Sequence, residues 1–121
     1  MKFYLAHSTA HDYKKELYGP LRVAFLDEHK IFFPHGTDGQ GAKSKEIIPK
    51  CDAVLAEVSL PSTGQGIELG WADARNIPII CFYRSDSSPS DALKFICNNM
   101  LEYSSSEEMI TKLRLEIQKL A

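Results

Sequence analysis

Residues 53–58 form an apolar run that passes directly into a loop of Pro, Ser and Gly and then into a helical pattern. The valines and leucine of this run suit a strand that is buried on both faces of a sheet. The helix is predicted over residues 65–76, with Glu68 in its first turn. A buried strand, a short loop and a helix in this order are the unit of a parallel α/β sheet. The loop is then expected at the carboxyl end of the strand, where such sheets bind ligands.

The same alternation continues along the rest of the chain. Strands are predicted over residues 2–6, 30–33, 53–58, 79–83 and 101–103. Helices are predicted over residues 11–29, 43–50, 65–76, 92–98 and 107–120. Gly19-Pro20 is expected to kink or split the first helix, because proline lacks an N–H and its ring clashes in a helix interior.

This order of elements predicts an α/β fold that is flavodoxin-like (Rossmann-like) and doubly wound. Its sheet would be mainly five-stranded and parallel, with helices on both faces. The chain has 121 residues and contains no linker or repeat, so residues 1–121 are expected to form one domain.

Composition and charge exclude several classes of protein. A net charge of -2 offers no electrostatic reason to bind nucleic acid or an anionic membrane. No apolar run approaches the ~20 residues of a membrane span, and the N-terminus turns polar too soon for a secretory signal. The three cysteines, Cys51, Cys81 and Cys97, include no CxxC pair. They are predicted to be buried apolar residues of a cytoplasmic protein, and neither a metal site nor a cofactor is expected.

The loop after residue 58 carries the groups of an anion site. A carboxylate in the first turn of a helix is stabilised by the positive end of the helix dipole, which would favour an ionised Glu68. The hydroxyls of Ser62 and Thr63 and the amides from Gly64 to Gly66 suit one phosphate. A phosphate at Ser62 and an electrophilic carbon at Glu68 fit one small substrate. From the residues alone, a Glu68 that only complements the helix dipole is the slightly favoured interpretation.

A dinucleotide site is a weaker interpretation of the glycines in this loop. Gly64, Gly66 and Gly70 have the spacing GxGxxxG, whereas dinucleotide-binding folds carry GxGxxG after their first strand. No acidic residue stands where the ribose would be bound, and no Gly-Lys-Ser/Thr run follows for a nucleoside triphosphate.

The segment DAVLAEVSLPSTGQGIELG (52–70), followed by Ala72 and by PIICFYR (78–84), closely resembles the nucleoside 2-deoxyribosyltransferase superfamily. Within that superfamily it is most similar to the 2'-deoxynucleoside 5'-phosphate N-hydrolases. FYLA (3–6) and Ser8 add a weaker match at the first strand.

The resemblance implies roles for three side chains. Glu68 would attack or stabilise the anomeric carbon while the N-glycosidic bond breaks, and the hydroxyl of Tyr4 would orient its carboxylate. Ser62 would bind a 5'-phosphate at the position where the transferases carry an aspartate. The exchange has a physical reason, because an aspartate would repel the phosphate that a hydroxyl can donate to.

One position departs from the superfamily. An acid that serves the leaving base or the ribose is replaced here by Ser44, and Glu46 and Asp38 lie near it in sequence but out of register. A neutral leaving base needs a proton donor. His7 or His11 could supply the proton, although both are interpreted as solvated loop residues.

The resemblance implies hydrolysis of the N-glycosidic bond of (2'-deoxy)nucleoside 5'-monophosphates, giving free base and (deoxy)ribose 5-phosphate, with Glu68 as nucleophile. It also implies a homodimer in which a serine of the neighbouring subunit reaches the phosphate. Ser87, Ser88 and Ser90 lie in the matching loop, and Ser90 is the one predicted to do so. The catalytic residues are then Glu68 and Tyr4. The predicted substrate-binding residues are Ser62, Gly64, Gly66, Ser8, His7, Ser44 and Ser90.

Two alternatives remain open at this point. A nucleoside 2-deoxyribosyltransferase would exchange bases between deoxynucleosides, which Ser62 disfavours. A non-catalytic nucleotide-binding module is favoured by Ser44 in place of the acid. In each case the partner is a small nucleotide or nucleoside, and no nucleic acid or membrane is expected.

Overall fold

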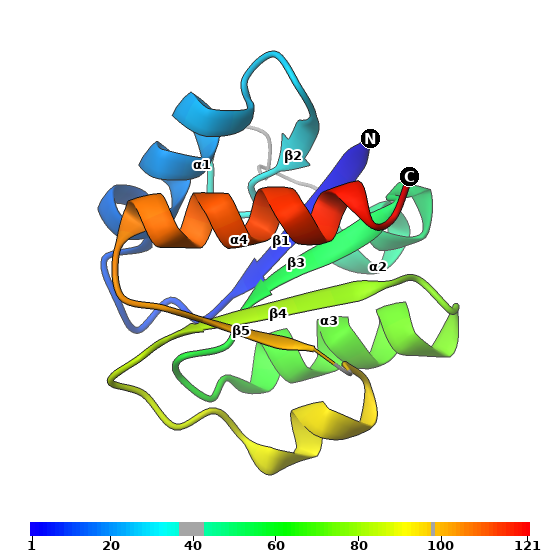
Figure 1. Ribbon diagram of the computed structural model, residues 1–121. Coiled ribbons are helices and arrows are strands. Elements are labelled where there is room, and N and C mark those ends of the chain that lie inside the picture. Colours follow the sequence, from blue (N-terminus) through cyan, green and yellow to red (C-terminus); the bar gives the residue numbers. More distant parts are fainter. Residues whose placement is uncertain (37–42, 98) are drawn as a thin grey trace.

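Five parallel strands form one sheet in the order β2-β1-β3-β4-β5 in the computed structural model, which describes residues 1–36, 43–97 and 99–121 (Figure 1). The strands are β1 (Lys2–His7), β2 (Lys30–Phe32), β3 (Ala53–Glu57), β4 (Ile79–Arg84) and β5 (Met100–Tyr103). Each agrees with its predicted range to within one residue at either end. The predicted doubly wound α/β fold is confirmed. The strand order reverses direction beside β1, so the carboxyl ends of β1 and β3 form the ligand-binding edge typical of such sheets.

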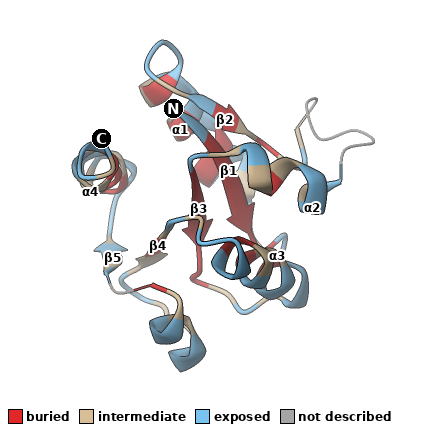
Figure 2. Ribbon diagram, turned by 90° about the vertical axis from the view of Figure 1, so that its right-hand side faces the viewer, coloured by how far each residue is buried: buried red, intermediate tan, exposed pale blue. Residues whose placement is uncertain are grey.

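Helices cover both faces of this sheet. The α-helices are α1 (Gly19–Phe25), α2 (Ser44–Ile47), α3 (Thr63–Ala74) and α4 (Ser106–Gln118). Shorter turns are η1 (Lys14–Tyr18), η3 (Ile48–Lys50) and η4 (Asp91–Phe95). Figure 2 shows α4 on one side of the sheet and α2 and α3 on the other, with buried residues concentrated on β1 and β3. The described part of the chain contains no helix that combines the length and the apolar character needed to span a bilayer.

The alternation of side chains along β1 explains why its sequence is apolar throughout. Phe3 and Leu5 pack with α1 and α4, whereas Tyr4 and Ala6 pack with α2 and α3. All four residues are buried because both faces of a parallel sheet are covered. Tyr4 is therefore the residue of β1 that brings a hydroxyl to the α3 side.

The first predicted helix is split, and Pro20 supplies the reason. Residues 14–18 form a wide π turn in which the N–H of Gly19 donates to the carbonyl of Lys14, and a regular helix then runs to Phe25. A π turn at this point accommodates a proline that has no N–H to give to the preceding turn. The predicted 43–50 helix likewise divides into α2 and the turn η3 at Pro49. The predicted 92–98 helix is the short turn η4, and position 98 lies outside the described residues.

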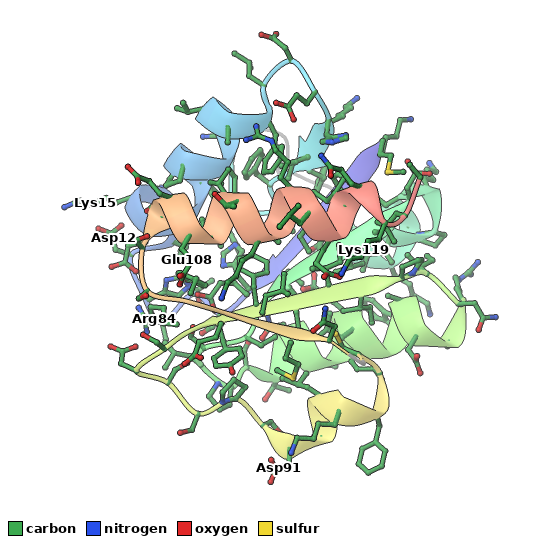
Figure 3. All side chains as sticks on the ribbon, in the orientation of Figure 1. Asp12, Lys15, Arg84, Asp91, Glu108 and Lys119 are labelled. Carbon is green, nitrogen blue, oxygen red and sulfur yellow. The ribbon has the colours of Figure 1, made fainter. Side chains whose placement is uncertain are left out.

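Charged side chains gather where β4 ends and α4 begins. Figure 3 shows Arg84 and Glu108 at the same end of the molecule as Asp12 and Lys15. Arg84 lies 3.4 Å from the carboxylate of Glu16 in η1. Exposed pairs of this kind contribute little to stability, and these residues belong to the α1 and α4 side of the sheet rather than to the cleft described next.

Candidate active site

A cleft of about 570 Å³ opens along α3, at the carboxyl ends of β1 and β3. One face of α3 forms a wall, because Gly64, Ile67, Glu68 and Trp71 follow the i, i+3, i+4, i+7 spacing of neighbours on a helix. The opposite side comes from loops and from the start of α2. The remaining described lining residues are His7, Thr9, His35, Lys43, Ser44, Lys45, Ser62 and Gln65.

The start of α3 differs from the prediction. The helix begins at Thr63, and Ser62 is its N-cap, whose hydroxyl oxygen accepts from the N–H of Gln65 at 3.5 Å. Glu68 is therefore the sixth residue of the helix and lies in its second turn, not in its first. Because the effect of the helix dipole falls off within the first turn, the dipole is a minor influence on Glu68. Hydrogen bonds from other parts of the fold determine the environment of Glu68 instead.

Tyr4 and Ser44 hold the carboxylate of Glu68. The hydroxyl of Tyr4 donates to Oε2 of Glu68, since an ionised carboxylate only accepts. Ser44 Oγ lies 2.6 Å from the same tyrosine oxygen, so its own proton points to Tyr4. Burial raises the pKa of Tyr4, and the hydrogen bond to Glu68 raises it further, so Tyr4 remains a donor. A chain of donors from Ser44 through Tyr4 thus orients Glu68 toward the cleft.

His7 is buried, which corrects its interpretation as a solvated loop residue. It is the last residue of β1, and its ring packs against those of Tyr13 and Tyr18. Burial lowers the pKa of His7 to about 4, against an opposing effect of the hydrogen bond to the Ser8 carbonyl. Nδ1 donates to that carbonyl at 2.8 Å. Nε2 then accepts from the hydroxyl of Tyr18 at 2.7 Å. Both ring nitrogens are occupied, so neutral His7 has no proton to give to a leaving base.

Known proteins resemble this chain in sequence over part of its length and in fold over nearly all of it. No family model matches the chain. A protein of Syntrophotalea carbinolica named "Putative 2'-deoxynucleoside 5'-phosphate N-hydrolase 1" is 38% identical over 73 residues, which are 57% of this chain and 51% of the relative. A protein of the same name from Methanosarcina barkeri is 43% identical over 49 residues, or 40% of this chain and 31% of the relative. The chain thus spans about half the length of the first relative and less of the second.

Two solved structures share the fold of this protein over nearly the whole chain. The CMP N-glycosidase of Clostridium botulinum superposes with a TM-score of 0.74 and 23% identity, covering 96% of this chain and 99% of the glycosidase. A 2-deoxyribosyltransferase of Bacillus psychrosaccharolyticus gives a TM-score of 0.65 at 15% identity, covering 91% and 90% of the two chains. The resemblance to the nucleoside 2-deoxyribosyltransferase superfamily is confirmed. At these identities the solved structures establish the shared fold alone.

Not all residues that the superfamily resemblance suggested lie in the cleft of Glu68. Gly66 and Ser90 line a neighbouring hollow of about 390 Å³ on another side of the α3 start. Ser90 caps η4, where its hydroxyl accepts from the N–H of Ala92. Ser8 is buried and accepts from the N–H of Ala10, so it shapes the loop after β1 instead of lining the cleft. Within one chain, Ser90 is thus separate from the cleft lining.

Of the three remaining candidates for a proton donor, two lie outside the cleft lining and the third lies outside the described residues. His11 is not among the lining residues; its side chain is 9% exposed, with Nδ1 3.5 Å from the Glu16 carboxylate. Glu46 is exposed and does not line the cleft. Asp38 lies outside the described residues. Glu68 is therefore the only carboxylate in the described lining.

Sequence reasoning missed Gln65, which fixes the start of α3 to the sheet. Its buried Nε2 donates to the carbonyl of Ala6 at 3.1 Å and to that of Glu57 at 2.7 Å. These carbonyls belong to the second-last residue of β1 and the last residue of β3, so one side chain satisfies both and sets the position of the helix. The spacing Ser62-x-x-Gln65 is a capping-box pattern and is the signal that would have placed the helix start correctly.

A second buried carboxylate, Glu57, stands at the end of β3. It accepts from the N–H of Ser59 at 2.6 Å and from the hydroxyl of Tyr103 at 2.5 Å. Burial, together with the hydrogen bond to Glu57, raises the pKa of Tyr103, which stays protonated as a donor. Buried charges persist only when they are hydrogen-bonded. Glu57 meets this condition and so ties β3 to β5 as a structural group.

Proposed function

We propose that this protein hydrolyses the N-glycosidic bond of nucleoside 5'-monophosphates, with Glu68 as the nucleophile. The observation that carries the proposal is the hydrogen bond from buried Tyr4 to Glu68, in a cleft whose end carries Ser62 and Gly64. A carboxylate oriented in this way suits a carbon that develops positive charge, as the anomeric carbon does when its bond to the base breaks.

The start of α3 suits the phosphate. Its first N–H groups lack partners within the helix and favour an anion. Ser62 accepts from Gln65 at the long distance of 3.5 Å and retains a proton to donate. Glu68 lies six residues further on, or roughly 9 Å along the helix axis. This separation suits a ribose 5-phosphate whose phosphate rests at Ser62 and whose anomeric carbon faces Glu68.

The reaction then proceeds in two steps. A carboxylate oxygen of Glu68 bonds to the anomeric carbon as the carbon–nitrogen bond breaks, and the electron pair leaves with the base. Water next attacks the same carbon, releases Glu68 as a carboxylate and supplies the proton that the base finally carries. The products are free base and (deoxy)ribose 5-phosphate, so atoms and charge balance.

Names of the relatives support a nucleotide over a nucleoside. The sequence relatives are named for 2'-deoxynucleoside 5'-phosphates and one structural neighbour for CMP. Ser62 supports the same choice, because a carboxylate at this position would repel a phosphate.

A cytoplasmic homodimer is part of this proposal. Ser90 of one subunit would complete the phosphate site of the other. Phe95, at the end of η4 opposite to its cap Ser90, is 90% exposed, which supports a partner on this surface. Sedimentation of the purified chain at the mass of a monomer would contradict the dimer.

A panel of nucleotides tests the function. The protein is incubated with common ribo- and deoxyribonucleoside monophosphates and with the matching nucleosides, and free base is measured by chromatography. We expect base release from at least one monophosphate and little from the nucleosides. Base exchange between nucleosides would indicate the transferase instead. Ligand-dependent thermal stabilisation without product would indicate a binding module.

Two glycines of α3 offer a matched test of the phosphate position. A Cβ on Gly64 or Gly70 would meet no atom within 4 Å, so alanine fits at both, but only Gly64 lines the cleft. Gly64→Ala is expected to raise KM roughly tenfold, as loss of about 1.5 kcal/mol in a hydrogen bond to a charged group would. Gly70→Ala should leave KM unchanged while stabilising the helix by ~0.5–1 kcal/mol. Equal KM values for both variants would contradict this phosphate position.

A further inference from the structure

The cleft continues past Glu68 to an end formed by Trp71 and Lys45. Trp71 is three residues after Glu68, or roughly 4.5 Å further along α3 and away from Ser62. Nζ of Lys45 lies 5.9 Å from the centroid of the Trp71 ring, and both residues line the cleft. If the phosphate is at Ser62 and the anomeric carbon at Glu68, the base extends to this pair.

This end of the cleft carries positive charge, and its described lining offers no carboxylic acid to protonate a base. Lys45 and Lys43 contribute ammonium groups to the described lining, where Glu68 is the only carboxylate. The hydroxyl of Ser44 is directed to Tyr4 and is not available to a base. His35 also lines the cleft, where its ring packs against those of His7 and Tyr13.

A base that receives no proton must leave as an anion. The stability of this anion then depends on how far the negative charge of the departing nitrogen is delocalised over the rest of the base. Uracil and thymine are imides and spread the charge over two carbonyl oxygens. Cytosine has one carbonyl and adenine none, so both leave more readily when an acid protonates them. A nearby ammonium stabilises the anion by direct attraction, without giving up a proton.

We propose, on the basis of the function above, that Trp71 and Lys45 bind the base and that Lys45 stabilises a base departing as its anion. The substrate class is then the 5'-monophosphates of imide bases, such as UMP, dUMP and TMP. The bond between the anomeric carbon and the nitrogen breaks, the electron pair stays on the base beside Lys45, and the proton of the hydrolytic water later neutralises it.

Binding can be measured without turnover, because Trp71 is the only tryptophan of the chain. UMP is expected to change the emission of Trp71, whereas ribose 5-phosphate, which lacks the base, should leave it nearly unchanged. An equal response to both, or none to UMP, would overturn the placement of the base. This measurement remains valid if no nucleotide is hydrolysed, so it separates this inference from the proposed function.

Kinetics test the role of Lys45. The wild type is expected to show a higher kcat/KM for UMP and dUMP than for CMP and AMP. Lys45→Gln should lower kcat/KM for UMP about tenfold. The ammonium of Lys45 lowers the pKa of the departing base by about one unit or more, and glutamine removes this effect. For the nucleotide of 5-fluorouracil, a more acidic base, the same substitution should lower kcat/KM by a smaller factor. Lys50→Gln is the control, since Lys50 is exposed and does not line the cleft.

Each other outcome contradicts the inference. An equal loss for all bases in Lys45→Gln would assign Lys45 to the phosphate or to folding, and thermal unfolding would tell these apart. A wild-type preference for CMP or AMP would overturn the substrate class while leaving the hydrolase function intact. A base-dependent loss in His35→Gln but not in Lys45→Gln would assign the leaving group to His35.

Discussion

Glu68→Gln is expected to lower the rate of base release by on the order of 10³-fold or more, as loss of a nucleophile does in other enzymes. Glutamine has the same shape, and its amide oxygen still accepts from Tyr4, but a neutral amide neither bonds to the anomeric carbon nor balances its charge. The measurement is free base from the best nucleotide of the panel, at saturating concentration. Thermal unfolding should change little, because the hydrogen bond that Tyr4 donates is retained.

Two further variants make this test specific. Glu46→Gln removes an exposed carboxylate outside the cleft and should keep full activity. Tyr4→Phe removes the donor to Glu68 and should reduce kcat roughly 10–100-fold, with KM less affected, since one positioning hydrogen bond is worth about 1.5–3 kcal/mol. Activity of Glu68→Gln near that of the wild type would refute the nucleophile. Full activity of Tyr4→Phe would refute only the orienting role.

The protein is expected to lose about 3 kcal/mol of stability between pH 6.5 and pH 4 through His7 alone. Burial lowers the pKa of His7 to about 4 in the fold, from an ordinary value of 6.5. As the pH falls below 6.5, the unfolded chain takes up the proton first, which favours unfolding. Well above pH 6.5 both states are neutral at this residue, so the effect is absent there.

Urea unfolding at several pH values measures this effect. His7→Gln is expected to be less stable than the wild type at pH 7, because it loses the packing with Tyr13 and Tyr18, but to show a flatter decline toward pH 4. Carboxylates also contribute to acid unfolding, so the difference in slope between the two proteins is the relevant quantity. His29→Gln, at a half-buried position, should retain most of the wild-type slope. Parallel curves for His7→Gln and the wild type would contradict a neutral, buried His7.

Local sequence patterns were sufficient to predict the strands and helices but not the residues at which the helices begin. The buried strands were predictable because both faces of a parallel sheet are covered, which leaves continuous apolar runs. The start of α3 was misplaced by two residues, since Thr63 and Gly64 have the composition of a loop. Their helical conformation depends on the cap at Ser62 and on Gln65, whose partners are carbonyls of two strands.

The sequence by itself determined the α/β alternation and the pairing of Glu68 with Ser62, because both depend on residues close together in the chain. Only the tertiary structure decided the surroundings of Glu68. Tyr4 lies 64 residues before it, and Ser44 lies 40 residues after Tyr4. The order of the strands brings these hydroxyls together, and hydrophobic periodicity does not encode that order. For the same reason the burial of His7 and the meeting of Lys45 with Trp71 became visible only in the folded chain.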